Sequence, residues 1–227
     1  MQQFVARSRV VVLPKDSTAL ALKVLGLIFV LLVWTAPRTA AAAAMVARAS
    51  DAAWQEVTHL GTAGTVERAF LDGVVAYQNG EYVRATKLWY SPAEQGHVLA
   101  QFNLGVAYAT GQGADLDFAK AARWWQAAGY QGHTAAQYNL GLLYSRGQGV
   151  EKSVAKARMW WYIAAMSGGD AAAQFHLGAL AATGEGEAQD FTEAAWWWSR
   201  SAAQGYEHAV KGLEILKQHG SLEVSKH

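Results

Sequence analysis

A tryptophan pair recurs along this chain at a nearly constant interval. Its copies are Trp124-Trp125, Trp160-Trp161 and Trp197-Trp198, spaced by 36 and 37 residues. Glycines follow the same period, at Gly96, Gly132, Gly168 and Gly205. A period of this length indicates stacked helix-turn-helix units, because one such unit cannot bury its apolar face without a neighbour.

Each unit shows the spacing of two amphipathic helices. In residues 134–170 the first apolar stripe consists of Ala136, Leu140, Leu143 and Tyr144, and the second of Ala157, Trp160, Trp161 and Ala164. Gly147 and Gly149 lie between the stripes and predict the end of the first helix. Gly141 lies inside that helix, where glycine is about 1 kcal/mol less favourable than alanine. We therefore expect a partner helix to approach closely at Gly141.

The order Ala-x-x-x-Leu-Gly-x-x-Tyr, Gly-x-Gly and Ala-x-x-Trp-Trp resembles the Sel-one-like repeat family, a branch of the tetratricopeptide superfamily. The resemblance covers about residues 66–216 and implies an all-α, right-handed α-solenoid of stacked helix-turn-helix repeats, with about nine helices. The units are expected at 66–97, 98–133, 134–170 and 171–205. The first unit has a shorter loop, and residues 206–218 match only a first helix, which predicts a polar capping helix.

The six tryptophans of the three main pairs are predicted to lie in the core. A large aromatic side chain buries about 150–250 Å², so these rings dominate the apolar area available to the repeats. We interpret them as packing residues rather than as a cofactor or sugar platform.

The first 49 residues are predicted to be a secretory signal and processing region. A basic start precedes an eleven-residue apolar run over 24–34, then Pro37 and an alanine block over 40–44. Because a spanning helix needs about 20 apolar residues, cleavage between Ala40 and Ala49 is favoured, with an uncleaved inner-membrane anchor as the alternative. Either outcome places the repeats outside the cytoplasm, in a bacterial periplasm or secreted. Residues 50–65 are expected to be a linker or N-terminal helix, and residues 219–227 a tail.

Composition argues against several functions. Residues 50–227 hold 13 basic and 17 acidic residues, a net charge of −4, which disfavours nucleic-acid binding. The chain has no cysteine, so disulfides, thiolate metal sites and a thiol nucleophile are excluded. Its seven histidines include no pair at the i, i+4 spacing of a helical zinc site. We predict no catalytic residue, no metal and no cofactor.

We therefore predict a surface that binds a protein or peptide partner. The resemblance places the first helix of each unit along a concave groove, with one column of Asn103, Asn139 and His176, and with Arg146 near the groove edge. An interhelical structural role for the two asparagines stays open. Trp196 and Tyr162 interrupt largely polar columns of the second helices, so both are candidate contact residues. For Trp196 the alternative is that it covers the capping helix.

The predicted function is a non-enzymatic protein-interaction scaffold. The resemblance implies adaptors or regulators of envelope complexes, membrane signalling or exopolysaccharide machinery. Two alternatives remain: a secreted binder of host proteins, and an activity associated with cell-wall or β-lactam hydrolysis. The second would need a nucleophile-base pair or a metal cluster, and the sequence pattern indicates neither. Contact with a membrane is expected only through the N-terminal signal or anchor.

Overall fold

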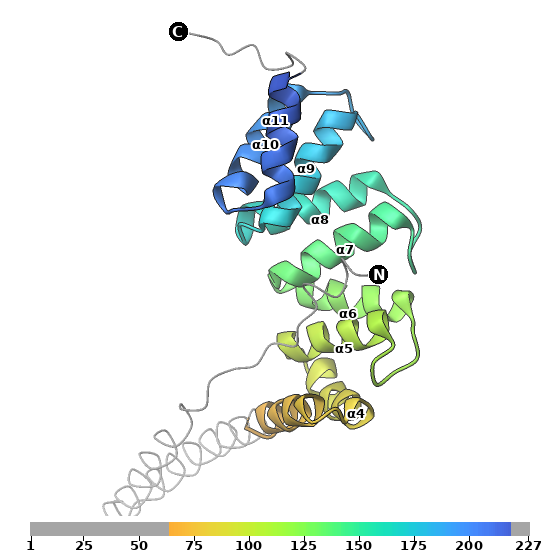
Figure 1. Ribbon diagram of the computed structural model, residues 1–227. Coiled ribbons are helices and arrows are strands. Elements are labelled where there is room, and N and C mark those ends of the chain that lie inside the picture. The colour runs from red at the N-terminus through yellow and green to blue at the C-terminus, as the bar shows by residue number, and fades with distance from the viewer. Residues whose placement is uncertain (1–63, 219–227) are drawn as a thin grey trace, which may run out of the picture.

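The computed structural model describes residues 64–218, which form nine helices and no strand (Figure 1). A helix over residues 64–78 comes first. It is followed by α4 (Tyr82–Glu94), α5 (Val98–Thr110), α6 (Phe118–Tyr130), α7 (Thr134–Arg146), α8 (Val154–Ser167), α9 (Ala171–Thr183), α10 (Phe191–Ala203) and α11 (Glu207–Gln218). The expected signal, the linker up to residue 63 and the tail over 219–227 lie outside the described residues.

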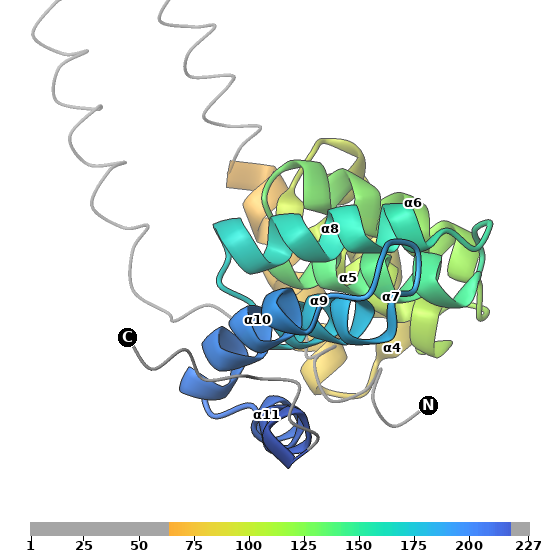
Figure 2. The same cartoon turned by 90° about the horizontal axis from the view of Figure 1, so that it is seen from above.

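The helices pack in chain order, each against the next, from α4 to α11. Figure 1 shows them stacked along one long axis, and Figure 2 shows α11 nearly end-on while α6 and α8 lie across the view. The chain is therefore an all-α solenoid of helix-turn-helix repeats, as predicted. Within residues 64–218, no helix is both long and apolar enough to cross a membrane.

Side chains and glycines at the turns define where the helices begin and end. His97 and His133 precede α5 and α7, and the Nδ1 atom of each accepts a hydrogen bond from the backbone N–H three residues later, at 3.2 Å in both cases. Asp170 caps α9 in the same way, at 2.8 Å. Gly147 ends α7 with a φ of 67°, a left-handed conformation that glycine adopts without strain.

The second tryptophan of each pair contacts the other helix of its unit through a hydrogen bond and through close packing of its ring. The indole Nε1–H of Trp161 donates to the backbone carbonyl of Tyr138 at 3.2 Å, and the ring lies directly over Gly141. The same bond recurs from Trp89 to Phe70, Trp125 to Phe102 and Trp198 to Phe175, at 3.0–3.2 Å, over Gly73, Gly105 and Gly178. A Cβ at any of these glycines would collide with the indole. The predicted close approach is confirmed, and its partner is a tryptophan ring.

Five of the six tryptophans predicted to be core are buried, with exposed fractions of at most 8%. The prediction is wrong for Trp124, which is only half-buried. In the next unit the Tyr130 ring contacts Trp160, whereas the residue at the equivalent position beside Trp124 is Glu94.

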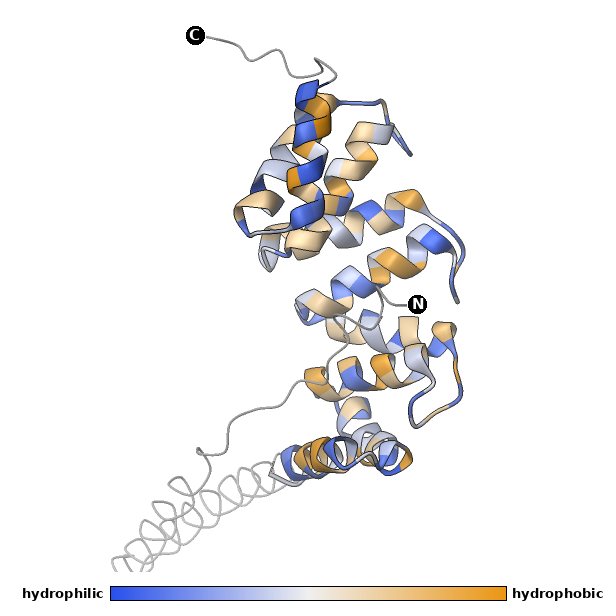
Figure 3. Ribbon diagram, in the orientation of Figure 1, coloured by the Kyte–Doolittle hydropathy of each residue, from blue (hydrophilic) through white to orange (hydrophobic). Residues whose placement is uncertain are grey.

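The two ends of the stack carry polar side chains. In the helix over residues 64–78, the exposed Arg68 and Asp72 stand where the next unit has the buried Ala100 and Leu104. At the other end, α11 buries Ala209, Gly212 and Leu216 and leaves its lysines and glutamates exposed. Figure 3 shows this as alternating blue and orange along α11. Apolar residues are also exposed there, Leu71 and Val75 at one end and Val210 and Ile215 at the other, so the two ends are mixed rather than purely polar.

Candidate functional site

A pocket of about 330 Å³ lies between α7 and α9, the first helices of two successive units. Its wall includes Arg146 of α7 and His176 of α9, two residues that the sequence predicted for binding. The other lining residues are six apolar side chains of α7, α8 and α9, two hydroxyl side chains and two charged loop residues: Leu142, Val154, Ala157, Trp161, Ala179, Leu180, Ser145, Thr183, Lys152 and Glu185. The stacking of repeats therefore brings Arg146 and His176 into one site.

The ring of His176 is held in place by aromatic neighbours. It stacks on Trp161 with ring centroids 4.5 Å apart and planes 13° apart. Its Nε2 atom lies 3.4 Å from the hydroxyl of Tyr138. At the rim of the pocket, Lys152 Nζ lies 3.6 Å from Glu185 Oε1. The histidine thus forms a rigid, partly exposed wall with an ion pair beside it.

Asn103 and Asn139 lie inside the protein rather than on an open surface. Their exposed fractions are 0% and 2%, and neither lines the pocket between α7 and α9. Within residues 64–218, both polar atoms of the Asn103 amide and the Nδ2 atom of Asn139 have no hydrogen-bond partner. The two asparagines are thus buried, whereas His176 of the same column is partly accessible.

Tyr162 and Trp196 form one exposed aromatic cluster across α8 and α10. Their exposed fractions are 50% and 49%, and both pack edge-on against Trp197, with centroids 6.0 and 4.5 Å away. The guanidinium of Arg200 lies 4.9 Å from the centre of the Trp196 ring. These contacts of Trp196 lie within α10, so they lend no support to the alternative that it covers the capping helix.

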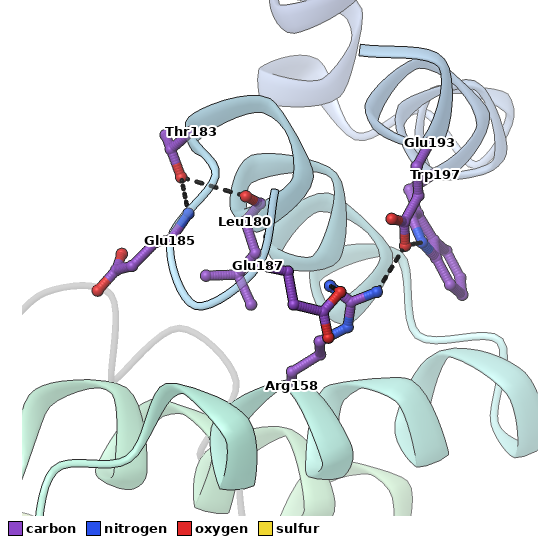
Figure 4. Close-up of polar contacts among 7 residues, drawn as sticks. All are labelled: Arg158, Leu180, Thr183, Glu185, Glu187, Glu193 and Trp197. Carbon is purple, nitrogen blue, oxygen red and sulfur yellow. Dashed lines mark hydrogen bonds and ion pairs between the residues drawn. The ribbon is translucent and has the colours of Figure 1, made fainter. Parts of the chain in front are cut away.

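Charged side chains are segregated between the two sets of helices. The first helices α5, α7 and α9 contain a single charged residue besides histidine, Arg146, whereas α4, α6, α8 and α10 contain seven basic and two acidic residues. Among the second set, Arg158 lies 2.6 Å from Glu187 and 2.9 Å from Glu193, and Glu193 also accepts a hydrogen bond from Trp197 Nε1 at 3.1 Å (Figure 4). These bonds tie the third unit to the fourth.

The structure shows no cluster of side chains typical of a metal site over residues 64–218. No group of three or more histidine, aspartate or glutamate side chains over residues 64–218 is placed to hold a metal ion. Burial lowers the pKa of His133 below its usual value, and a hydrogen bond within its own residue partly opposes this shift. A neutral ring at His133 suits its structural task, since its Nδ1 must accept the Ala136 N–H.

Sequence reasoning missed Thr183 and Leu180, which line the same pocket as Arg146. The signal for Thr183 was present, because it lies 37 residues after Arg146, at the same position of the next unit. Leu180 is apolar and repeats Leu143, so the pattern alone could not separate a pocket residue from a core residue.

Paired helices that stack in order, each pair locked by a tryptophan over a glycine, define an α-solenoid repeat protein. The Sel1 repeat model matches residues 98–133, 134–169 and 171–206, so these three units are Sel1 repeats.

Two solved structures are similar to this chain. A protective antigen of uropathogenic Escherichia coli strains with an SLR fold matches with a TM-score of 0.66 and 28% identity over 73% of this chain. A Sel1 repeat protein from Oxalobacter formigenes matches with a TM-score of 0.61 and 30% identity over 67% of this chain. The matches span only 36% and 60% of those two proteins. Comparison with curated proteins gives no match.

Proposed function

We propose that this chain is a non-enzymatic scaffold that holds a segment of a partner protein in the pocket between α7 and α9, as an adaptor or regulator of an envelope complex. Sel1 repeats generally mediate protein–protein interactions. Structural relatives of this chain are likewise typically non-catalytic scaffolds.

The observation that carries the proposal is the convergence of Arg146 and His176 in a pocket whose other walls are mostly apolar. Because α5, α7 and α9 hold no other formal charge, an extended segment with apolar side chains suits this surface better than a highly charged one. The guanidinium of Arg146 can donate several hydrogen bonds to a carbonyl or carboxylate of that segment. Apolar contacts would then provide affinity, and Arg146 would orient the bound chain.

Export to the periplasm is part of the proposal. It is supported by the eleven-residue apolar run over 24–34, the basic residues before it and the alanine block after it. N-terminal sequencing of protein recovered from the periplasm should begin between Thr39 and Asp51. Recovery of soluble cytoplasmic protein that still begins at Met1 would refute export.

Secretion beyond the cell is a second candidate. It is favoured by one observation, the similarity to a protective antigen of uropathogenic Escherichia coli. Fractionation separates the two locations, since an adaptor of the envelope stays in the periplasm and a secreted binder accumulates in the medium.

Site-specific photo-crosslinking tests the pocket. A benzophenone amino acid at Thr183, an exposed residue of the pocket wall, should crosslink a defined envelope protein that mass spectrometry identifies. The same probe at Val210, which is 41% exposed on α11, is the matched control. Arg146→Ala should reduce the Thr183 crosslink in a chain whose helical content by far-UV circular dichroism is unchanged. Equal crosslinking from both positions, or no effect of Arg146→Ala, would remove this pocket as the binding site.

A further inference from the structure

A second cavity, of about 370 Å³, lies between α4 and α6, the second helices of the first two units. It is lined by Tyr90, Glu94, Lys120, Arg123, Trp124 and Ala127. Its volume falls in the range of pockets that hold small ligands or single large side chains. The half-buried face of Trp124 lies here, with Tyr90 packed edge-on against it at 5.6 Å.

The repeat register explains why this cavity exists. A shift of 36 residues takes Trp124 to Trp160, and there the equivalent of Glu94 is Tyr130. The Tyr130 ring lies 5.2 Å from that of Trp160, which is only 2% exposed. The same shift takes Ala127 to the larger Ile163. In the earlier unit a carboxylate therefore replaces the ring that contacts Trp160, and a methyl group replaces the Ile163 side chain, beside the half-buried Trp124.

Charge at the rim differs between the two positions as well. Arg123 stands where the next unit has Met159. Across residues 64–218, neither Arg123 nor Glu94 has an oppositely charged group within 4.0 Å, whereas Lys120 Nζ lies 3.4 Å from Asp117 Oδ2. A ligand could thus pair an anionic group with Arg123 and donate a backbone N–H to Glu94.

We propose that this cavity binds an aromatic side chain of a partner protein that is flanked by an acidic residue. The chain itself shows which chemistry fits, because an aromatic ring already occupies the equivalent place on Trp160. An aromatic anchor in a pocket beside a charged rim is the usual composition of a strong protein contact. The inference shares one assumption with the proposed scaffold function, namely that the ligand is part of a protein. It concerns a different surface from the pocket between α7 and α9.

Indole resonances of the 15N-labelled full-length chain can test the proposal. Trp124→Phe assigns the Trp124 signal, and the probe is the peptide acetyl-Glu-Phe-Glu-amide. We expect a saturable shift of the Trp124 resonance. Acetyl-Glu-Ala-Glu-amide, which lacks the ring, and acetyl-Lys-Phe-Lys-amide, which reverses the flanking charge, should each bind roughly tenfold more weakly or worse.

Exchanging residues between equivalent positions of the two units provides the variants for this test. Glu94→Tyr installs the aromatic side chain that contacts Trp160, so it should abolish the peptide-induced shift and keep or raise the thermal midpoint. Arg123→Met should remove the preference for acidic over basic flanks. Tyr130→Glu should open the equivalent site and make the Trp160 resonance respond to the same peptide.

The absence of a saturable shift at Trp124, or a shift that persists in Glu94→Tyr, would overturn the proposal. Equal binding of the acidic and basic peptides would overturn its charge component. Crosslinking from Thr183 would be unaffected by these outcomes, so failure of this site and failure of the proposed scaffold function can be distinguished.

Discussion

Replacing Gly141 with alanine should destabilise this protein, although the same change stabilises most helices. In an unobstructed helix the substitution is favourable by about 1 kcal/mol. Here the new Cβ would collide with Nε1 and Cδ1 of Trp161, whose ring is 3% exposed and has little room to move.

Two effects set the magnitude. Inserting a methyl group into a packed core is unfavourable by about 1–3 kcal/mol. Displacing the indole also breaks the bond from Trp161 Nε1 to the Tyr138 carbonyl, 3.2 Å long and buried, and an unsatisfied buried group is unfavourable by about 1–3 kcal/mol. After the helix gain is subtracted, the net loss is about 1–5 kcal/mol.

Urea unfolding followed by far-UV circular dichroism measures this loss as a lower midpoint, provided that the slope of the transition is unchanged. The control is the same substitution in a Trp161→Leu background, where no indole lies over residue 141 and alanine should be neutral or favourable. The difference between the two backgrounds is the coupling energy of the glycine–tryptophan contact. An alanine that stabilises the parent chain, or that destabilises both backgrounds equally, would refute the reasoning.

Two further predictions concern polar groups. The amide oxygens of Gln101 and Gln174 each accept a hydrogen bond from a glutamine 30 residues later. At the position 30 residues after Gln137 the chain has Ser167 instead, and the buried Oε1 of Gln137 has no partner over residues 64–218. Ser167→Gln should therefore raise the free energy of unfolding in urea by about 0.5–1.5 kcal/mol, and an unchanged or lower midpoint would contradict this. Burial lowers the pKa of His133, so as the pH falls the unfolded chain takes up a proton at this residue before the folded chain does. The stability that neutral His133 provides is therefore present above about pH 6.5, and it is lost as the pH falls through the lower pKa of the folded state. His133→Asp, which installs the cap found at Asp170, should lose less stability between pH 7 and pH 5 than the parent chain, and identical profiles would show that His133 does not contribute.

Much of the fold follows from spacing alone. The 36-residue period, the alternating apolar stripes and the paired glycines of each loop predict stacked helix pairs, because these signals are local and every repeat restates them. Gly141 is a clear instance, since a glycine inside a helix already indicated close packing before its partner was known. Only the three-dimensional arrangement shows that the partner is the ring of Trp161, 20 residues away.

The binding surfaces were predicted less completely. Asn139 and His176 share one position of the repeat, yet the first is 2% exposed and the second lies in a pocket wall. The position within the repeat specifies the direction in which a side chain leaves its helix. Whether that side chain is exposed or buried depends on the residues that the neighbouring unit packs against it. Column analysis correctly singled out Tyr162 and Trp196 as exposed aromatics, and it could not show that both rest on Trp197.

Trp124 marks the boundary between what the sequence by itself determined and what the tertiary structure decided. The sequence determined the helices, their order and the tryptophan core, because hydrophobic periodicity acts within a unit. Trp124 is half-buried in a cavity wall with Glu94 and Ala127, where the next unit has Tyr130 and Ile163 at the equivalent positions. Packing between units depends on side-chain size across an interface, so only the assembled stack reveals which equivalent positions are covered and which remain open.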